Sequence, residues 1–351
     1  MRLLCTALMA VYLVAPSGDD IGSFSFFHPT VVLSPADLAR LSGGAPLVRF
    51  LPASGRDVGA FTAIAVSPTV TVDRATAWMR QVELLRQNRY VLASQRLTSP
   101  PRLSDFDRLV LDDDDLDEIR QCVPGRCGVK LTGADIKYLT DVAATAGSDW
   151  KPHLQQAFRR MLLRRVSSFA AGGLPALDDI VDKKRPSSPA GAMGLLLEHT
   201  AFLDDRLPDL ASQFVGSNGS DADRETFMYW SKERLGGKPV ITVTHMTLMA
   251  DRARIRPPVL MVGTQVYASH YLDASLTVTA FVQDSPASRG YFVYLHRSSV
   301  DLLGGFWGGI ARSMIESRVR KDGPAILRAI SERLANGDPP TTSDRHGGPP
   351  R

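Results

Sequence analysis

Cysteine is scarce in this chain, and its scarcity argues against several kinds of site. The sequence holds three cysteines in 351 residues, at positions 5, 122 and 127. No second Cys or His pair stands near the last two at the spacing of zinc ligands. Their separation also differs from the C-x-x-C pattern of redox-active pairs. We therefore predict no metal site and no cofactor.

The chain also lacks a strong charge of one sign and, beyond its N-terminus, a long apolar run. It has 41 Lys and Arg residues against 37 Asp and Glu residues, a formal net charge of +4. Proteins that bind nucleic acid usually carry a basic face. The basic residues here are scattered, so no nucleic acid partner is expected. No later apolar run reaches the roughly 20 residues of a transmembrane helix.

Motifs that identify common enzymes are missing as well. The sequence has no P-loop, no dinucleotide-binding fingerprint and no H-E-x-x-H pair. Ser269, His270 and Asp273 have the residue types of a catalytic triad. Residues this close on a strand alternate between its two faces, however, and cannot form the relay. No catalytic residue is predicted.

The first 17 residues have the composition of a secretory signal peptide. Arg2 supplies a positive charge, residues 3–15 are apolar apart from Thr6, and small residues follow at 15–18. The segment is too short to span a bilayer. We expect cleavage after residues 1–17 and export to the periplasm or the medium. A misassigned start codon, or a buried strand or helix, is the alternative.

Cys122 and Cys127 would remain after that cleavage. Pro124 and Gly125 between them form a turn signal, because proline presets φ and glycine accepts a positive φ. Such a turn can bring the two thiols together. A disulfide closing this loop would add about 2 kcal/mol of stability. Free thiols, and a redox or metal role, are the alternatives.

The order of strand-like and helix-like segments indicates an α+β protein. Strands are expected at 47–51, 59–66 and 89–97, with a helix before the third, and residues 98–220 are rich in helical patterns. Five strands are then expected, at 226–234, 239–249, 258–270, 272–283 and 290–298. A long amphipathic helix follows over 303–334, and the tail 337–351 has a disordered composition.

This order resembles the START-like helix-grip superfamily, which includes lipid-transfer domains and polyketide-cyclase-like proteins. The resemblance covers roughly 47–97 and 224–336 and rests on element order. It implies an antiparallel sheet that grips the C-terminal helix, built from residues 18–97 and 221–336, with 98–220 as an inserted helical subdomain. It also implies an apolar cavity between sheet and helix, often occupied by lipid or another hydrophobic ligand.

Six residues are candidate ligand contacts in such a cavity. His245 shares strand parity with Ile241 and Val243, which predicts that it points to an apolar side. Aromatic side chains with polar tips suit a cavity wall. The full set is Trp230, His245, Tyr267, His270, Arg297 and Trp307. Ordinary core packing is the alternative for the aromatic and histidine side chains, and a local ion pair or helix cap is the alternative for Arg297.

Three functions follow from these patterns. The leading one is an exported protein that binds a hydrophobic or lipid-like ligand. The second is a cyclase- or hydrolase-type enzyme that uses His245 or His270, and the third is an interaction protein that works through 98–220. Glycines 304, 305, 308 and 309 beside Phe306 and Trp307 indicate close approach to a sheet, a ligand or a membrane. Peripheral membrane contact is therefore included among the expected partners.

Overall fold

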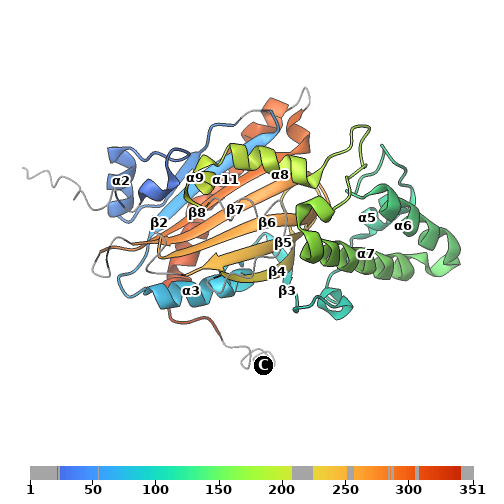
Figure 1. Ribbon diagram of the computed structural model, residues 1–351, viewed down its shortest axis with the longest axis horizontal. Helices are drawn as coiled ribbons and strands as arrows, with labels where there is room; N and C mark the ends of the chain where they lie inside the picture. Colours follow the sequence, from blue (N-terminus) through green and yellow to red (C-terminus); the bar gives the residue numbers. More distant parts are fainter. Residues whose placement is uncertain are drawn as a thin grey trace, which may run out of the picture.

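The computed structural model describes residues 22, 24–53, 55–207, 224–250, 257–283, 285, 288–304 and 308–340. Over these residues the chain forms an eight-stranded antiparallel sheet with helices on both faces (Figure 1). A long helix is the last element of the described chain, as the element order predicted. Among the described helices, none is long and apolar enough to cross a membrane. The predicted signal peptide and Trp307 lie outside the described residues.

The sheet runs in the order β1-β2-β8-β7-β6-β5-β4-β3. Its strands are β1 Leu47–Phe50, β2 Asp57–Ala65, β3 Val91–Arg96, β4 Arg224–Glu233, β5 Val240–Met249, β6 Val259–Ala268, β7 Leu272–Val282 and β8 Tyr291–Val300. Strands β4 to β8 form the continuous antiparallel series that the sequence predicted. The early strands extend this series at its two ends, because β2 pairs with β8 and β3 pairs with β4.

The helices begin where the sequence offers caps. The α-helices are α2 Pro35–Ser42, α3 Val72–Arg80, α4 Val82–Leu85, α5 Asp113–Arg120, α6 Gly133–Thr145, α7 Trp150–Gly172, α8 Pro189–Glu198, α9 Ala201–Arg206 and α11 Gly308–Ala335. Ser34 caps α2 and Thr71 caps α3 by accepting a backbone N–H of the first turn. A short 3₁₀ turn, η5 Asp301–Gly304, follows β8 before the start of α11, and α11 continues through Pro324.

Helices cover the sheet on two sides. The α11 face, which carries Ile64, Met246 and Phe292, packs against α3, α4 and the end of α11. The insertion face, which carries Val243 and Leu295, packs against α7, α8 and the N-terminal helices. Helices of 98–220 therefore share one apolar core with the sheet. Their status as a separate subdomain stays a prediction.

Because helices cover both faces of the sheet, polar side chains of strand β7 are buried as well as apolar ones. Its sequence alternates between apolar and hydroxyl side chains, which predicts a strand with one solvated face. Thr277 and Thr279 are nevertheless buried, with 6% and 3% of their surfaces exposed. They alternate with Leu276 and Val278 of the insertion-face core, so they point to the α11 face. The expectation of a half-buried strand is corrected: its polar side lies under a helix.

Candidate functional site on the α11 face

Helix α11 contacts both edges of the sheet within one turn. The guanidinium of Arg320 lies 4.4 Å from the ring centre of Phe50 in β1. Two residues later, Asp322 accepts a hydrogen bond from the Tyr90 hydroxyl just before β3, at 2.5 Å. Seven strand spacings would separate these edges by about 34 Å on a flat sheet, whereas a helix with its side chains is about 10–12 Å across. The sheet therefore curls around α11, in agreement with a helix-grip arrangement.

The apolar packing between α11 and the sheet is interrupted in its middle. Near the start of the helix, Ala311 and Ile315 pack on a small cluster formed by Val58, Val300 and Leu303. Near its end, α11 joins a separate cluster through Leu327, Ile330 and Leu334. Ile315 and Ile326, which border the interruption, are about 16 Å apart along the helix axis.

Polar side chains occupy the sheet at this interruption. On β8, His296 lies between Val300 of one apolar cluster and Phe292 of the other. Beside it on β2, Ala60 pairs with His296 in register. Both His296 and Ala60 remain half-buried although they belong to central parts of their strands. The gap between the two apolar clusters is thus lined by small or polar groups.

An arginine and two tyrosines complete the cluster around His296. Arg86, which follows α4, donates a hydrogen bond to the Tyr229 hydroxyl at 2.6 Å. Its guanidinium carbon lies 5.7 Å from the ring centre of Tyr294. The Tyr294 and His296 rings are stacked, with centres 6.3 Å apart and planes 15° from parallel. The four side chains come from β4, β8 and the end of α4, three segments that are distant in sequence.

Burial is the main cause of the shifted pKa values of the histidine and the two tyrosines in this cluster. It lowers the pKa of His296 to about 4, and the positive charge of Arg86 acts in the same direction. Burial also raises the pKa of Tyr229 and of Tyr294, against the attraction of Arg86. The pKa of Arg86 itself is raised, first by Tyr229. At neutral pH the cluster therefore contains one guanidinium cation, two neutral phenols and a neutral imidazole, a set that can hold oxygen atoms of a ligand.

Three of the predicted ligand contacts face away from α11. The Trp230 indole donates to the carbonyl of Asp105 at 2.8 Å. The His245 ring centre lies 5.2 Å from that of Phe169 in α7. Tyr267 also packs against α7, on the insertion face. The expectation that these residues share a cavity with α11 is therefore corrected, because the apolar side of their strands is covered by the other helix layer.

His270 and Arg297 form contacts within the protein. The Nδ1 atom of His270 lies 2.9 Å from the Gly128 carbonyl oxygen and forms a hydrogen bond with it, whereas Nε2 lies 3.2 Å from an Asp115 carboxylate oxygen without hydrogen-bond geometry. Arg297 forms an ion pair with Asp57 on the neighbouring strand β2. Its partner is therefore distant in sequence, and the local ion pair or helix cap near the start of the last helix is not its role. Ligand contact by the six predicted residues stays a prediction.

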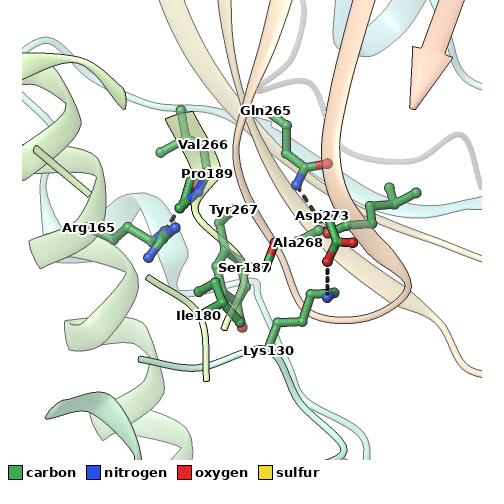
Figure 2. Close-up of a pocket in the computed structure, with 11 residues that line it drawn as sticks. Lys130, Arg165, Ile180, Ser187, Pro189, Gln265, Val266, Tyr267, Ala268 and Asp273 are labelled. Atoms are coloured by element: carbon green, nitrogen blue, oxygen red, sulfur yellow. Dashed lines mark hydrogen bonds and ion pairs between the residues drawn. The ribbon is translucent and has the colours of Figure 1, made fainter. Parts of the chain in front are cut away.

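A second polar cluster lies where β6 and β7 separate. Their ladder ends at Thr264 and Leu276. Beyond that point the buried Lys130 ammonium is 2.7 Å from Asp273 and 3.1 Å from Asp301, as the close-up of this pocket shows for Asp273 (Figure 2). The pocket has a volume of about 20 Å³, room for about one water molecule. It is too small for a drug-sized ligand, which needs at least about 300 Å³.

The predicted disulfide is confirmed. Cys122 and Cys127 are bonded, with their Cα atoms 4.6 Å apart. The loop that they close docks on the segment before α8: the Cys127 amide donates to the Asp182 carbonyl at 2.9 Å, and the Gly125 amide donates to the Val181 carbonyl at 2.7 Å. Gly125 has a φ of +84°, which explains why glycine is needed in this turn. The disulfide therefore holds the segment that carries Asp182 beside Lys130.

Comparison with known proteins adds little to this geometry. No protein-family model and no curated protein matches the chain. Among solved structures, the chain is similar to the Zhui aromatase/cyclase from Streptomyces sp. R1128, with 17% sequence identity over 42% of this chain and 85% of that chain. The TM-score is 0.25. A similarity this low gives no information about the activity of this chain. The description of the fold rests on the chain's own contacts.

Proposed function

We propose that the protein binds a hydrophobic or lipid-like small molecule between the α11 face of its sheet and helix α11. The observation that carries the proposal is the interrupted packing at His296. Two apolar clusters flank half-buried polar side chains beneath a helix that the sheet encloses. An apolar ligand would continue the apolar clusters, and its polar group would meet Tyr294 and His296.

Binding is favoured over catalysis by the acid–base properties of the site. A general base is most effective when its pKa lies near the working pH. The pKa of His296 is about 4, which makes the neutral ring a hydrogen-bonding group and a weak base. The alternative of a cyclase or hydrolase using His245 or His270 gains no support, because His270 is buried and bonded to the Gly128 carbonyl and His245 packs on Phe169. The role of 98–220 as an interaction surface gains none either, since its apolar side chains enter the shared core.

The gap can be tested by filling it. Ala60 is half-buried, pairs with His296 and points to the α11 face, because its neighbour Phe61 belongs to the insertion-face core. In Ala60→Leu the added side chain should occupy the gap. We expect binding of a neutral fluorescent lipid analogue to weaken at least tenfold while the melting temperature stays within a few degrees. Ala60→Ser is the matched control and should bind as the wild type does.

Two results would overturn the proposal. If Ala60→Leu folds and binds the probe unchanged, the ligand lies elsewhere. If Ala60→Leu loses the 1–3 kcal/mol typical of an overpacked core and wild-type protein binds no probe, the gap is closed in solution. Mass spectrometry of small molecules that co-purify with protein from its native host would identify the natural ligand.

We also propose that the protein is exported. The support is the pattern of residues 1–17 together with the Cys122–Cys127 disulfide, a bond typical of oxidising compartments. N-terminal sequencing of protein made in its own host should find a start near Gly18. Mature protein in the cytoplasm that retains Met1 would contradict export.

A further inference from the structure

Arg86 distinguishes the α11-face cluster from an ordinary polar core. It is half-buried beneath the enclosed helix, and the pKa of its guanidinium is raised, so it stays charged. A charge in such a place is usually paired with an opposite charge, because removal from water is costly. Among the described residues, Arg86 contacts a phenol oxygen and an aromatic face, and no carboxylate lies within ion-pair distance.

The acidic group whose charge acts on Arg86 is already engaged. Glu233 acts on Arg86 through its charge at longer range. Its carboxylate accepts a hydrogen bond from the Ser231 hydroxyl at 2.8 Å. One terminal nitrogen of Arg86 is used by Tyr229. The guanidinium has five N–H donors in a planar fork, and its other nitrogens are absent from the buried unsatisfied atoms of the described chain.

The groups around Arg86 suit a ligand with an anionic oxygen group. Tyr229 and Tyr294 are neutral hydroxyl groups, and His296 is a neutral ring that can donate one hydrogen bond. A neutral ligand would leave the guanidinium without a counter-charge, whereas a carboxylate would form a charge-assisted and even bidentate pair with it. The two apolar clusters along α11 leave the remainder of such a ligand in hydrocarbon-like surroundings.

We infer that the ligand is an amphipathic carboxylic acid, such as a fatty acid or an aromatic acid, whose carboxylate pairs with Arg86. This inference rests on the proposed function and names the ligand class for the same site. The carboxylate would lie at Arg86 between the Tyr229 and Tyr294 rings. The apolar part would extend along β8 beneath α11, past Ala60.

The test compares two probes that differ in one group. A fluorescent long-chain fatty acid and the corresponding fluorescent alcohol are titrated separately into wild-type protein at pH 7.5. We expect the acid to bind at least tenfold more tightly than the alcohol. In Arg86→Met the preference should disappear, so that the acid and the alcohol bind with similar affinity. Arg86→Lys, which keeps a charge but loses the planar fork, should retain part of the preference.

The outcomes separate the two proposals. Equal binding of acid and alcohol by wild-type protein would overturn the carboxylate inference and leave the proposed function standing. Binding of neither probe would overturn both. A preference for the acid that survives in folded Arg86→Met would place the carboxylate at another cation and overturn the inference. The wild-type comparison requires no variant, so it tests the ligand class even if Arg86→Met does not fold, and Arg86→Lys then tests the pairing with Arg86.

Discussion

His245 and His296 lie on opposite faces of one sheet, and burial lowers the pKa of each to about 4. His245 packs against Phe169 on the insertion face. His296 stacks on Tyr294 under α11, where the charge of Arg86 adds to the effect of burial. The two histidines thus share a protonation state but differ in what surrounds them: an aromatic core on one side and a polar gap on the other.

Protonation of these histidines should make stability depend on pH. The pKa of each in the folded protein is about 4, below the ordinary value of about 6.5 that applies to the unfolded chain. Between these values the unfolded chain binds more protons, so stability is complete above pH 6.5 and falls as the pH drops toward 4. Each histidine contributes up to about 1.4 kcal/mol per pH unit in that window.

Urea unfolding between pH 7 and pH 5 measures this dependence. We expect His245→Phe and His296→Phe each to reduce the loss of stability on acidification, and the double variant to reduce it further. The same loss in wild-type protein and in a folded double variant would show that both rings already titrate near their ordinary pKa in the native state.

The strands could be predicted because their signal is local. In β7, apolar and hydroxyl side chains alternate along the strand, and this pattern depends only on neighbouring residues. Element order then led to an antiparallel sheet with a gripped C-terminal helix.

The position of the site could not be predicted in the same way. Alternation separates the two faces of a strand, but it does not say which helix layer covers which face. His245 was correctly assigned to an apolar side, yet that side packs on α7. The residues that face α11 are those next to His245 and its equivalents along each strand. Thr244 and Tyr229, for example, both lie on the α11 face. The role of Arg86 could not be predicted from the sequence, because only the tertiary fold brings the end of α4 close to β8.

Lys130 should be essential for stability. Its side chain is 4% exposed, and its ammonium lies within 3.7 Å of carboxylates from Asp182, Asp273 and Asp301. Desolvation opposes the charge, but these carboxylates outweigh it and raise the pKa of Lys130. In Lys130→Met three acidic groups would lose their shared partner, and we expect a loss of about 3–5 kcal/mol in the free energy of unfolding.

A surface lysine provides the control for that measurement. Lys137 pairs with Asp141 one helical turn away, and its side chain is 79% exposed. Lys137→Met should change stability by less than about 0.5 kcal/mol, since exposed pairs are screened by water. Equal effects of the two substitutions in urea unfolding would mean that the Lys130 cluster is hydrated in solution.

The disulfide should stabilise the same region. Its loop supports the segment carrying Asp182 through two backbone hydrogen bonds. We expect the double variant Cys122→Ser/Cys127→Ser to lose about 2 kcal/mol in the free energy of unfolding. Thiol titration of unreduced, denatured wild-type protein should find neither of these cysteines free. Two reactive thiols at these positions would show that the bond does not form in the native host.

The contact between Tyr90 and Asp322 should control how easily α11 leaves the sheet. The Tyr90 hydroxyl donates to Asp322, and the Arg89 guanidinium reaches the other carboxylate oxygen at 2.5 Å. The Tyr90 hydrogen bond is the first cause of a lowered pKa at Asp322, so the contact should persist in acid to below the ordinary carboxyl pKa. Tyr90→Phe removes the hydroxyl and keeps the ring.

We expect Tyr90→Phe to accelerate hydrogen–deuterium exchange in the first half of α11 several-fold, with less change beyond Leu327, where the helix packs on an apolar cluster. A bound fatty acid probe should also dissociate faster, because the helix that covers it opens more often. Tyr138→Phe, on α6 in the helical region, is the matched control and should leave exchange in α11 unchanged. If Tyr90→Phe and Tyr138→Phe give the same exchange pattern, the grip on α11 depends on its apolar ends rather than on this hydrogen bond.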